Sequence, residues 1–212
     1  LADADVFAEL TPTERAAQFR FTFPQSDSSF IVVDAFDKGS YIKIIPGEKK
    51  IIGYTTKHSQ PVPANFKNYF VIYIDKPFSI THTFSGKTLD KNATELNADH
   101  TGAIIGFKTA KGEKINVKVA SSFISAEQAD ISLKREIANN SFEQTKQQAK
   151  DTWNKVLGKV RAEGGTTDQL RTFYSCLYRT VFFPNKLYEL DAQNKIVHYS
   201  PYNGDVLPGY MF

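Results

Sequence analysis

The chain up to residue 124 is a series of short apolar segments separated by polar turns. Residues 18–23 alternate polar and aromatic side chains, which is the period-two pattern of a half-buried antiparallel strand. Residues 69–74 are continuously apolar, which indicates a strand that is buried on both faces. Further strands are expected at residues 30–33, 41–45, 50–55, 78–84, 104–107 and 115–119. Many short strands without intervening helices predict an antiparallel β-sandwich, with a turn at residues 25–29 and a loop at residues 88–99.

After residue 124 the apolar positions change to a helical period. Ser125 and Ser141 are expected to be the N-caps of two successive helices, because a hydroxyl side chain can accept a hydrogen bond from a free backbone N–H of the first turn. Gln128 completes a capping box with Ser125. Thr166 or Thr167 is expected to cap a third helix. The chain is therefore predicted to place strands first and helices second.

The third helix should carry a broad apolar stripe that runs from Leu170 to Val181. Cys176, the single cysteine, lies within this stripe, so a buried structural thiol is favoured over a nucleophile. Trp153, the single tryptophan, lies on the apolar face of the second helix, where core packing is favoured over a platform for a sugar ring. Residues 184–212 are rich in Tyr, Pro, Gly and Asn, and are predicted to be irregular, with a hairpin around residues 192–194.

Charge and hydropathy narrow the classes of partner. The 26 basic and 23 acidic residues are scattered and give a net charge of +3, so no nucleic-acid partner is expected. No apolar run approaches the roughly 20 residues that a membrane-spanning helix needs, so no membrane span is expected. The chain starts at Leu1 without Met and ends on an apolar stretch at Phe212. We therefore expect both ends to lie within a longer protein, and the lack of a signal peptide carries no information on location.

Several segments of the chain, in their order and spacing, resemble one known family. These segments are residues 9–24, 124–129, 153–166, 171–180, 198–202 and 208–210. Together they are similar to glycoside hydrolase family 92, the calcium-dependent exo-α-mannosidases. The resemblance implies an α+β fold, in which an antiparallel β-sandwich precedes the first helices of an (α/α)6 barrel. It divides the chain into part of an N-terminal sandwich domain (1–124), linking helices (125–165) and the truncated start of the catalytic barrel (166–212).

The resemblance also implies a function. It makes the chain part of a secreted bacterial α-mannosidase, expected to prefer α-1,2 linkages, that hydrolyses terminal α-mannosides of glycans with inversion in the periplasm or outside the cell. The expected partners are mannose-containing glycans and the remainder of the parent chain. The general acid and the general base are expected to lie beyond Phe212, and the ligands of Ca²⁺ mostly outside this chain, so no catalytic residue is assigned and the isolated chain should be inactive. The alternative is a non-catalytic carbohydrate-binding β-sandwich protein.

Four side chains are candidates for substrate binding: His198, Tyr199, Tyr202 and Arg179. The first three lie in an aromatic segment that can offer stacking faces and hydrogen-bond donors to a sugar, although plain loop packing is an alternative. Arg179 lies beside the apolar stripe of the third helix and either supports the pocket or is a solvated arginine.

Four acidic residues near predicted strand ends or turns are candidates for structural roles. Asp34 and Asp37 follow a predicted strand, and Glu189 and Asp191 flank the predicted hairpin. In such positions turn and packing roles are favoured over direct catalysis.

Overall fold

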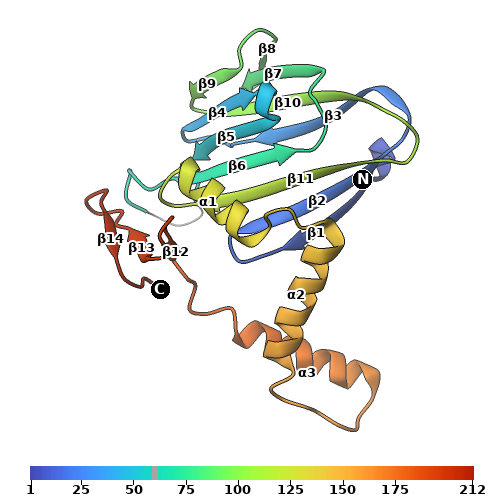
Figure 1. Ribbon diagram of the computed structural model, residues 1–212, viewed down its shortest axis with the longest axis vertical. Coiled ribbons are helices and arrows are strands. Elements are labelled where there is room, and N and C mark those ends of the chain that lie inside the picture. Colours follow the sequence, from blue (N-terminus) through green and yellow to red (C-terminus); the bar gives the residue numbers. More distant parts are fainter. Residues whose placement is uncertain (59–61) are drawn as a thin grey trace.

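The computed structural model describes residues 1–58 and 62–212, and it contains two antiparallel sheets packed face to face (Figure 1). The larger sheet has the order β1-β2-β11-β6-β5-β4-β9 and the smaller has the order β3-β10-β7-β8. The larger sheet consists of β1 (Phe7–Pro12), β2 (Ala16–Phe23), β4 (Ser40–Ile45), β5 (Lys50–Thr55), β6 (Asn68–Ile74), β9 (Glu95–Ala98) and β11 (Glu113–Ser122). The smaller consists of β3 (Ser26–Asp34), β7 (Ile80–Ser85), β8 (Thr88–Asp90) and β10 (Thr101–Thr109). The predicted antiparallel β-sandwich is confirmed.

Two polar stretches that were expected to be irregular form strands. β3 begins at Ser26, within the expected turn, because the Ser29 hydroxyl points inward and lies 2.7 Å from the Thr109 hydroxyl. β8 and β9 occupy most of the expected loop at residues 88–99. Both are short strands at the edge of a sheet, where backbone hydrogen bonds to one neighbour do not require an apolar side-chain pattern. The predictions of a turn and a loop were therefore wrong at these positions.

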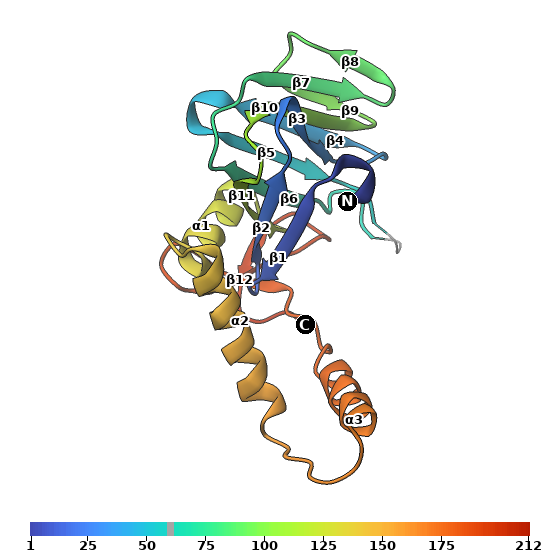
Figure 2. The ribbon, with the colours of Figure 1, turned by 90° about the vertical axis from the view of Figure 1, so that its right-hand side faces the viewer.

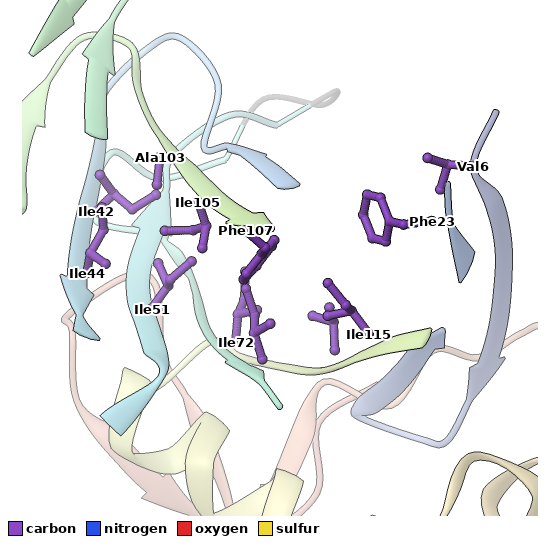
Figure 3. Close-up of a cluster of buried hydrophobic side chains, with 12 residues drawn as sticks. Val6, Phe23, Ile42, Ile44, Ile51, Ile72, Ala103, Ile105, Phe107 and Ile115 are labelled. Atoms are coloured by element: carbon purple, nitrogen blue, oxygen red, sulfur yellow. The ribbon is translucent and has the colours of Figure 1, made fainter. Parts of the chain in front are cut away.

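The core lies between the two sheets and consists mainly of isoleucine side chains (Figure 3). Ile42, Ile51, Ile105 and Ile115 are fully buried there. The expectation that residues 69–74 are covered on both sides is confirmed at the centre of β6. Ile72 points into the core between the sheets, and its neighbour Val71 points to the opposite face of the sheet, under a helix.

Three helices follow the sandwich: α1 (Ala126–Glu136), α2 (Phe142–Leu157) and α3 (Thr167–Thr180). Ser125, Ser141 and Thr166 cap them as predicted, and the capping boxes of the second and third helices are complete. The box predicted for α1 is only half formed. Ser125 Oγ accepts a hydrogen bond from Gln128 N, but the Gln128 side chain donates instead to the backbone carbonyl of Leu190 at 2.7 Å.

The helices differ in how much of their apolar surface is covered. α1 lies across the outer face of the larger sheet and buries Ala129, Leu133 and Ile137 there. α2 touches β1 and β2 only near its first turn, and its other end and α3 extend away from the sandwich in both views (Figures 1 and 2). No residue of α3 is buried within the described chain, so Cys176 is exposed and the expected buried thiol is wrong here. The ring of Trp153 packs on Tyr178, with 4.5 Å between the ring centroids.

The last residues form a small antiparallel sheet, β12-β13-β14, which lies beside α1 (Figure 1). Its strands are β12 (Tyr188–Leu190), β13 (Ile196–Tyr199) and β14 (Val206–Pro208). The predicted hairpin around residues 192–194 is confirmed, because β12 pairs with β13 across it. The prediction of a wholly irregular segment was wrong, since strands of three or four residues are too short to show a period in the sequence.

Candidate functional site

Two of the candidate residues are consecutive on the central strand of the small sheet. His198 and Tyr199 are the last two residues of β13, and both side chains are half-buried. The Nδ1 atom of His198 lies 3.1 Å from the carbonyl oxygen of Gly209. The Tyr199 hydroxyl donates to the carbonyl of Asn65 at 2.9 Å, so β13 is bonded to the segment between β5 and β6. The Tyr199 contact thus lies at the border between the small sheet and the sandwich, whereas the His198 contact lies within the segment of the small sheet.

Four aromatic side chains pack together where the small sheet meets the sandwich. We call them the aromatic junction: His58, Phe66, Phe123 and Tyr199. The centroid of Phe66 lies 5.0 Å from that of His58, 4.9 Å from that of Phe123 and 6.2 Å from that of Tyr199. The junction joins three segments that are far apart in the sequence. Phe66 and Phe123 could not be found from the sequence pattern, because both lie in connecting segments without a period.

The other two candidates lie elsewhere. Tyr202 is in the turn between β13 and β14 and is 88% exposed. Arg179 is exposed on α3, which lies far from β13 in both views of the ribbon (Figures 1 and 2). The described chain therefore does not gather the candidates at one place: His198 and Tyr199 are neighbours on β13, and Arg179 lies apart from them.

Three side chains from the sandwich and α1 hold the backbone that leads into this site. Arg15, in the turn between β1 and β2, donates to the carbonyls of Lys186 and Tyr188. Arg135 donates to the carbonyls of Leu190 and Asp191 at 2.7 and 2.6 Å. Gln128 shares the Leu190 carbonyl, as described above. All three bond to backbone carbonyls, so these contacts hold β12 without involving its own side chains.

Glu189 is the buried acid of this region, with 3% of its surface exposed. Its Oε1 atom accepts a hydrogen bond from the backbone N–H of Phe123 at 2.8 Å. Its Oε2 atom has no hydrogen-bond partner within the described residues. Burial raises the pKa of this carboxyl, while Ser122, the Phe123 N–H and Arg15 act in the opposite direction.

The other three acids have structural roles, as expected. Asp191 accepts hydrogen bonds from the N–H groups of Gln193 and Lys195 inside the hairpin. Asp34 accepts from Phe36 N at 2.8 Å, in the turn after β3. Asp37 pairs with Lys57, which lowers the pKa of its carboxyl.

The described residues do not fit a calcium site. Among them there is no group of three or more His, Cys, Asp or Glu side chains that could hold a metal ion. Calcium needs six to eight oxygen ligands, and carboxylates usually supply several of them. None of the described helices is long and apolar enough to cross a membrane.

Comparison with known proteins places the chain in a family. A model of the glycosyl hydrolase family 92 N-terminal domain matches residues 1–122, and a model of the catalytic domain of that family matches residues 128–211. The chain belongs to glycosyl hydrolase family 92. Its described structure holds part of the N-terminal domain and the start of the catalytic domain.

Solved structures of this family share the fold. The family GH92 inverting mannosidase BT2199 of Bacteroides thetaiotaomicron VPI-5482 is 44% identical over 97% of this chain, with a TM-score of 0.92. The family GH92 α-mannosidase BT3965 of Bacteroides thetaiotaomicron, in complex with mannoimidazole, is 25% identical over 99% of this chain, with a TM-score of 0.86. This chain spans 28% of the length of each of these structures. No curated protein matches the chain.

Proposed function

We propose that the protein carrying this chain is a periplasmic or extracellular α-mannosidase that removes terminal α-linked mannose from glycans with inversion. The observation that carries the proposal is the 44% identity, over 97% of this chain, to a structure described as an inverting mannosidase. A second relative, described as an α-mannosidase, was solved with mannoimidazole bound. The substrate class proposed is therefore mannose-containing glycans.

The preferred linkage is proposed to be α-1,2. The test is release of mannose by the full-length protein from α-1,2-, α-1,3-, α-1,4- and α-1,6-linked mannobioses. Nuclear magnetic resonance during hydrolysis of the corresponding methyl mannobiosides, whose leaving mannoside has a fixed anomeric centre, identifies the anomer of the released mannose. Release of β-mannose, fastest from the α-1,2 compound, is the expected result. Release of α-mannose would contradict inversion, and a faster reaction on another linkage would contradict the linkage alone.

Within this mechanism the described residues serve binding and orientation. Inverting hydrolysis needs a general acid and a general base whose carboxyl groups are about 6.5–9.5 Å apart, with room for a water molecule. Glu189 is enclosed, and Asp191 is committed to a turn, so neither is offered as acid or base. We assign His198 and Tyr199 to the substrate side, because both lie in an aromatic segment that can offer hydrogen bonds and a stacking face to a sugar, within the residues that match the catalytic domain. The isolated chain of residues 1–212 should therefore release no mannose under conditions in which the full-length protein does.

Calcium is proposed as the cofactor of the full-length protein, with its ligands outside residues 1–212. The proposal rests on family membership, since the described residues do not form such a site. Bound calcium would supply positive charge for polarising hydroxyl oxygens of the substrate. Treatment with a chelator should abolish mannose release, and added Ca²⁺ should restore it. Full activity after exhaustive chelation would contradict the proposal.

A binding module without catalysis is the alternative function. The match of residues 128–211 to a catalytic-domain model weighs against it, because a self-contained sandwich would not need these helices. A full-length protein that binds mannosides but cleaves none of the mannobioses would favour this alternative.

A further inference from the structure

We propose that Glu189 is a positioning residue that holds the small sheet, and with it His198 and Tyr199, in register with the end of the sandwich. The inference rests on the proposed function to the extent that these two side chains face the substrate. In this role Glu189 acts through other residues and does not contact a sugar.

The location of Glu189 connects β12 both to β13 and to the sandwich. β12 pairs with β13 so that Glu189 lies opposite Val197, the residue directly before His198. A shift of Glu189 along or away from its partner would therefore move β13. The bond from Phe123 N to Glu189 Oε1 ties this pair of strands to the segment between β11 and α1.

Phe123 connects Glu189 to Tyr199 by another route. Its backbone N–H is bonded to the carboxylate, and its ring stacks on Phe66 within the aromatic junction. Phe66 in turn packs on Tyr199, whose hydroxyl bonds to the neighbouring Asn65. Glu189 thus contacts one segment of the sandwich and Tyr199 another, and the stacking of Phe123 on Phe66 joins the two segments.

Packing alone does not explain why residue 189 carries a carboxyl. A buried carboxyl with one oxygen bonded and the other without a partner in the described chain is costly compared with an amide or an apolar side chain. Arg15, Gln128 and Arg135 already fix the backbone of β12. Beyond those contacts, the carboxyl bonds to the backbone N–H of Phe123, whose ring belongs to the aromatic junction.

The test compares substitutions in the full-length protein. Glu189→Gln keeps a carbonyl oxygen for Phe123 N, whereas Glu189→Leu keeps the volume and removes the acceptor. Glu189→Asp shortens the side chain by one methylene, and replaces the leucine variant if that protein does not fold. Glu48→Gln and Glu48→Leu are matched controls, because Glu48 is exposed in the turn between β4 and β5.

Two readouts are measured on each variant: kcat and KM on an α-linked mannobiose, and hydrogen exchange of peptides covering residues 186–199 and residues 101–109. We expect Glu189→Leu to lower kcat/KM by about tenfold or more, since small misplacements near a reacting centre have effects of this size. Exchange should rise in residues 186–199 and stay unchanged in β10. Glu189→Gln should restore both readouts to near the wild-type values, and the Glu48 variants should match wild type.

The two readouts separate this inference from the proposed function. If the wild-type protein cleaves no mannoside, the proposed function fails, and the exchange experiment still decides whether Glu189 positions the small sheet. Unchanged exchange at residues 186–199 in Glu189→Leu would overturn the inference. An equal rise of exchange in β10 would also overturn it, because Glu189 would then stabilise the whole fold rather than position one sheet. Unchanged kcat/KM with faster exchange at residues 186–199 would overturn the link to the substrate side.

Discussion

The sandwich and the third helix are both built on regular apolar patterns, but only the sandwich buries its pattern within this chain. Ile51 and Ile105 lie between two sheets and are fully buried. On α3, Phe173 and Tyr178 are 38% and 37% exposed, although they belong to a stripe of the correct helical spacing. An apolar period therefore predicts which face of an element needs a partner, and it does not say whether the partner lies in the same chain.

The largest loss of unfolding free energy is expected when a core side chain of the sandwich is truncated. Ile105→Ala should lower the unfolding free energy of the 1–212 chain by about 2–5 kcal/mol, because it leaves a cavity between the sheets. Phe173→Ala should change it by less than about 0.5 kcal/mol in the same chain, since no residue of α3 is buried there. Urea unfolding followed by circular dichroism measures both. A large loss from Phe173→Ala in the isolated chain would show that α3 is docked in solution.

The comparison becomes sharper when the same substitution is made in the full-length protein. There Phe173→Ala should cost more than in the 1–212 chain, if the remainder of the catalytic domain covers the stripe. Equal costs in both proteins would contradict that expectation.

A smaller effect is expected where α2 meets the sandwich. Gln18 Nε2 donates to Thr145 Oγ1 at 2.7 Å, and Thr145 is fully buried. Thr145→Val removes this acceptor without changing the volume, so it should cost about 1–2 kcal/mol of unfolding free energy. Thr152→Val on the exposed part of α2 is the matched control and should cost less than about 0.5 kcal/mol. Equal effects of the two substitutions would mean that α2 is not anchored at its first turn.

Removal of a helix cap should lower the unfolding free energy by about 1 kcal/mol, and again only where the helix is docked on the sandwich. Ser141→Ala removes the cap of α2, beside the buried Phe142, and should lower the unfolding free energy by about 1 kcal/mol. Thr166→Ala removes an equally complete capping box from α3. It should reduce helical circular dichroism without shifting the unfolding midpoint of the sandwich. A shift of the same size for both variants would contradict the difference between the two helices.

Much of this architecture can be predicted from the sequence, for physical reasons that differ between elements. The strands at residues 18–23 and 69–74 and the three N-caps depend on local patterns, and the sequence contains those patterns in full. β8 and β9 could not be predicted, because edge strands are held by backbone pairing that leaves no apolar pattern.

The candidate site was only partly predictable. The aromatic segment drew attention to His198 and Tyr199, but their connection to Phe66 and Phe123 depends on residues brought together by the fold. The buried position of Glu189 was likewise invisible, since Arg15 and Arg135 hold β12 through backbone carbonyls. Contacts that use the backbone as acceptor leave almost no trace in residue type.

The smallest expected effect is a dependence of stability on pH that arises from Glu189. A carboxyl whose pKa is raised in the folded state binds its proton more tightly there than in the unfolded chain, where the usual value is 4.5. Stability from this group is therefore fully present below pH 4.5 and declines as the pH rises through the higher folded value. Glu189→Gln cannot titrate, so the melting temperature of wild type relative to this variant should fall as the pH rises above 4.5. Thermal melts of both proteins at matched ionic strength measure the difference, and Glu48→Gln is the control for general charge effects. A rise of the relative melting temperature with pH would mean that the carboxylate form of Glu189 is stabilised in the fold, with Ser122 and the Phe123 N–H rather than burial as the dominant influence on its pKa.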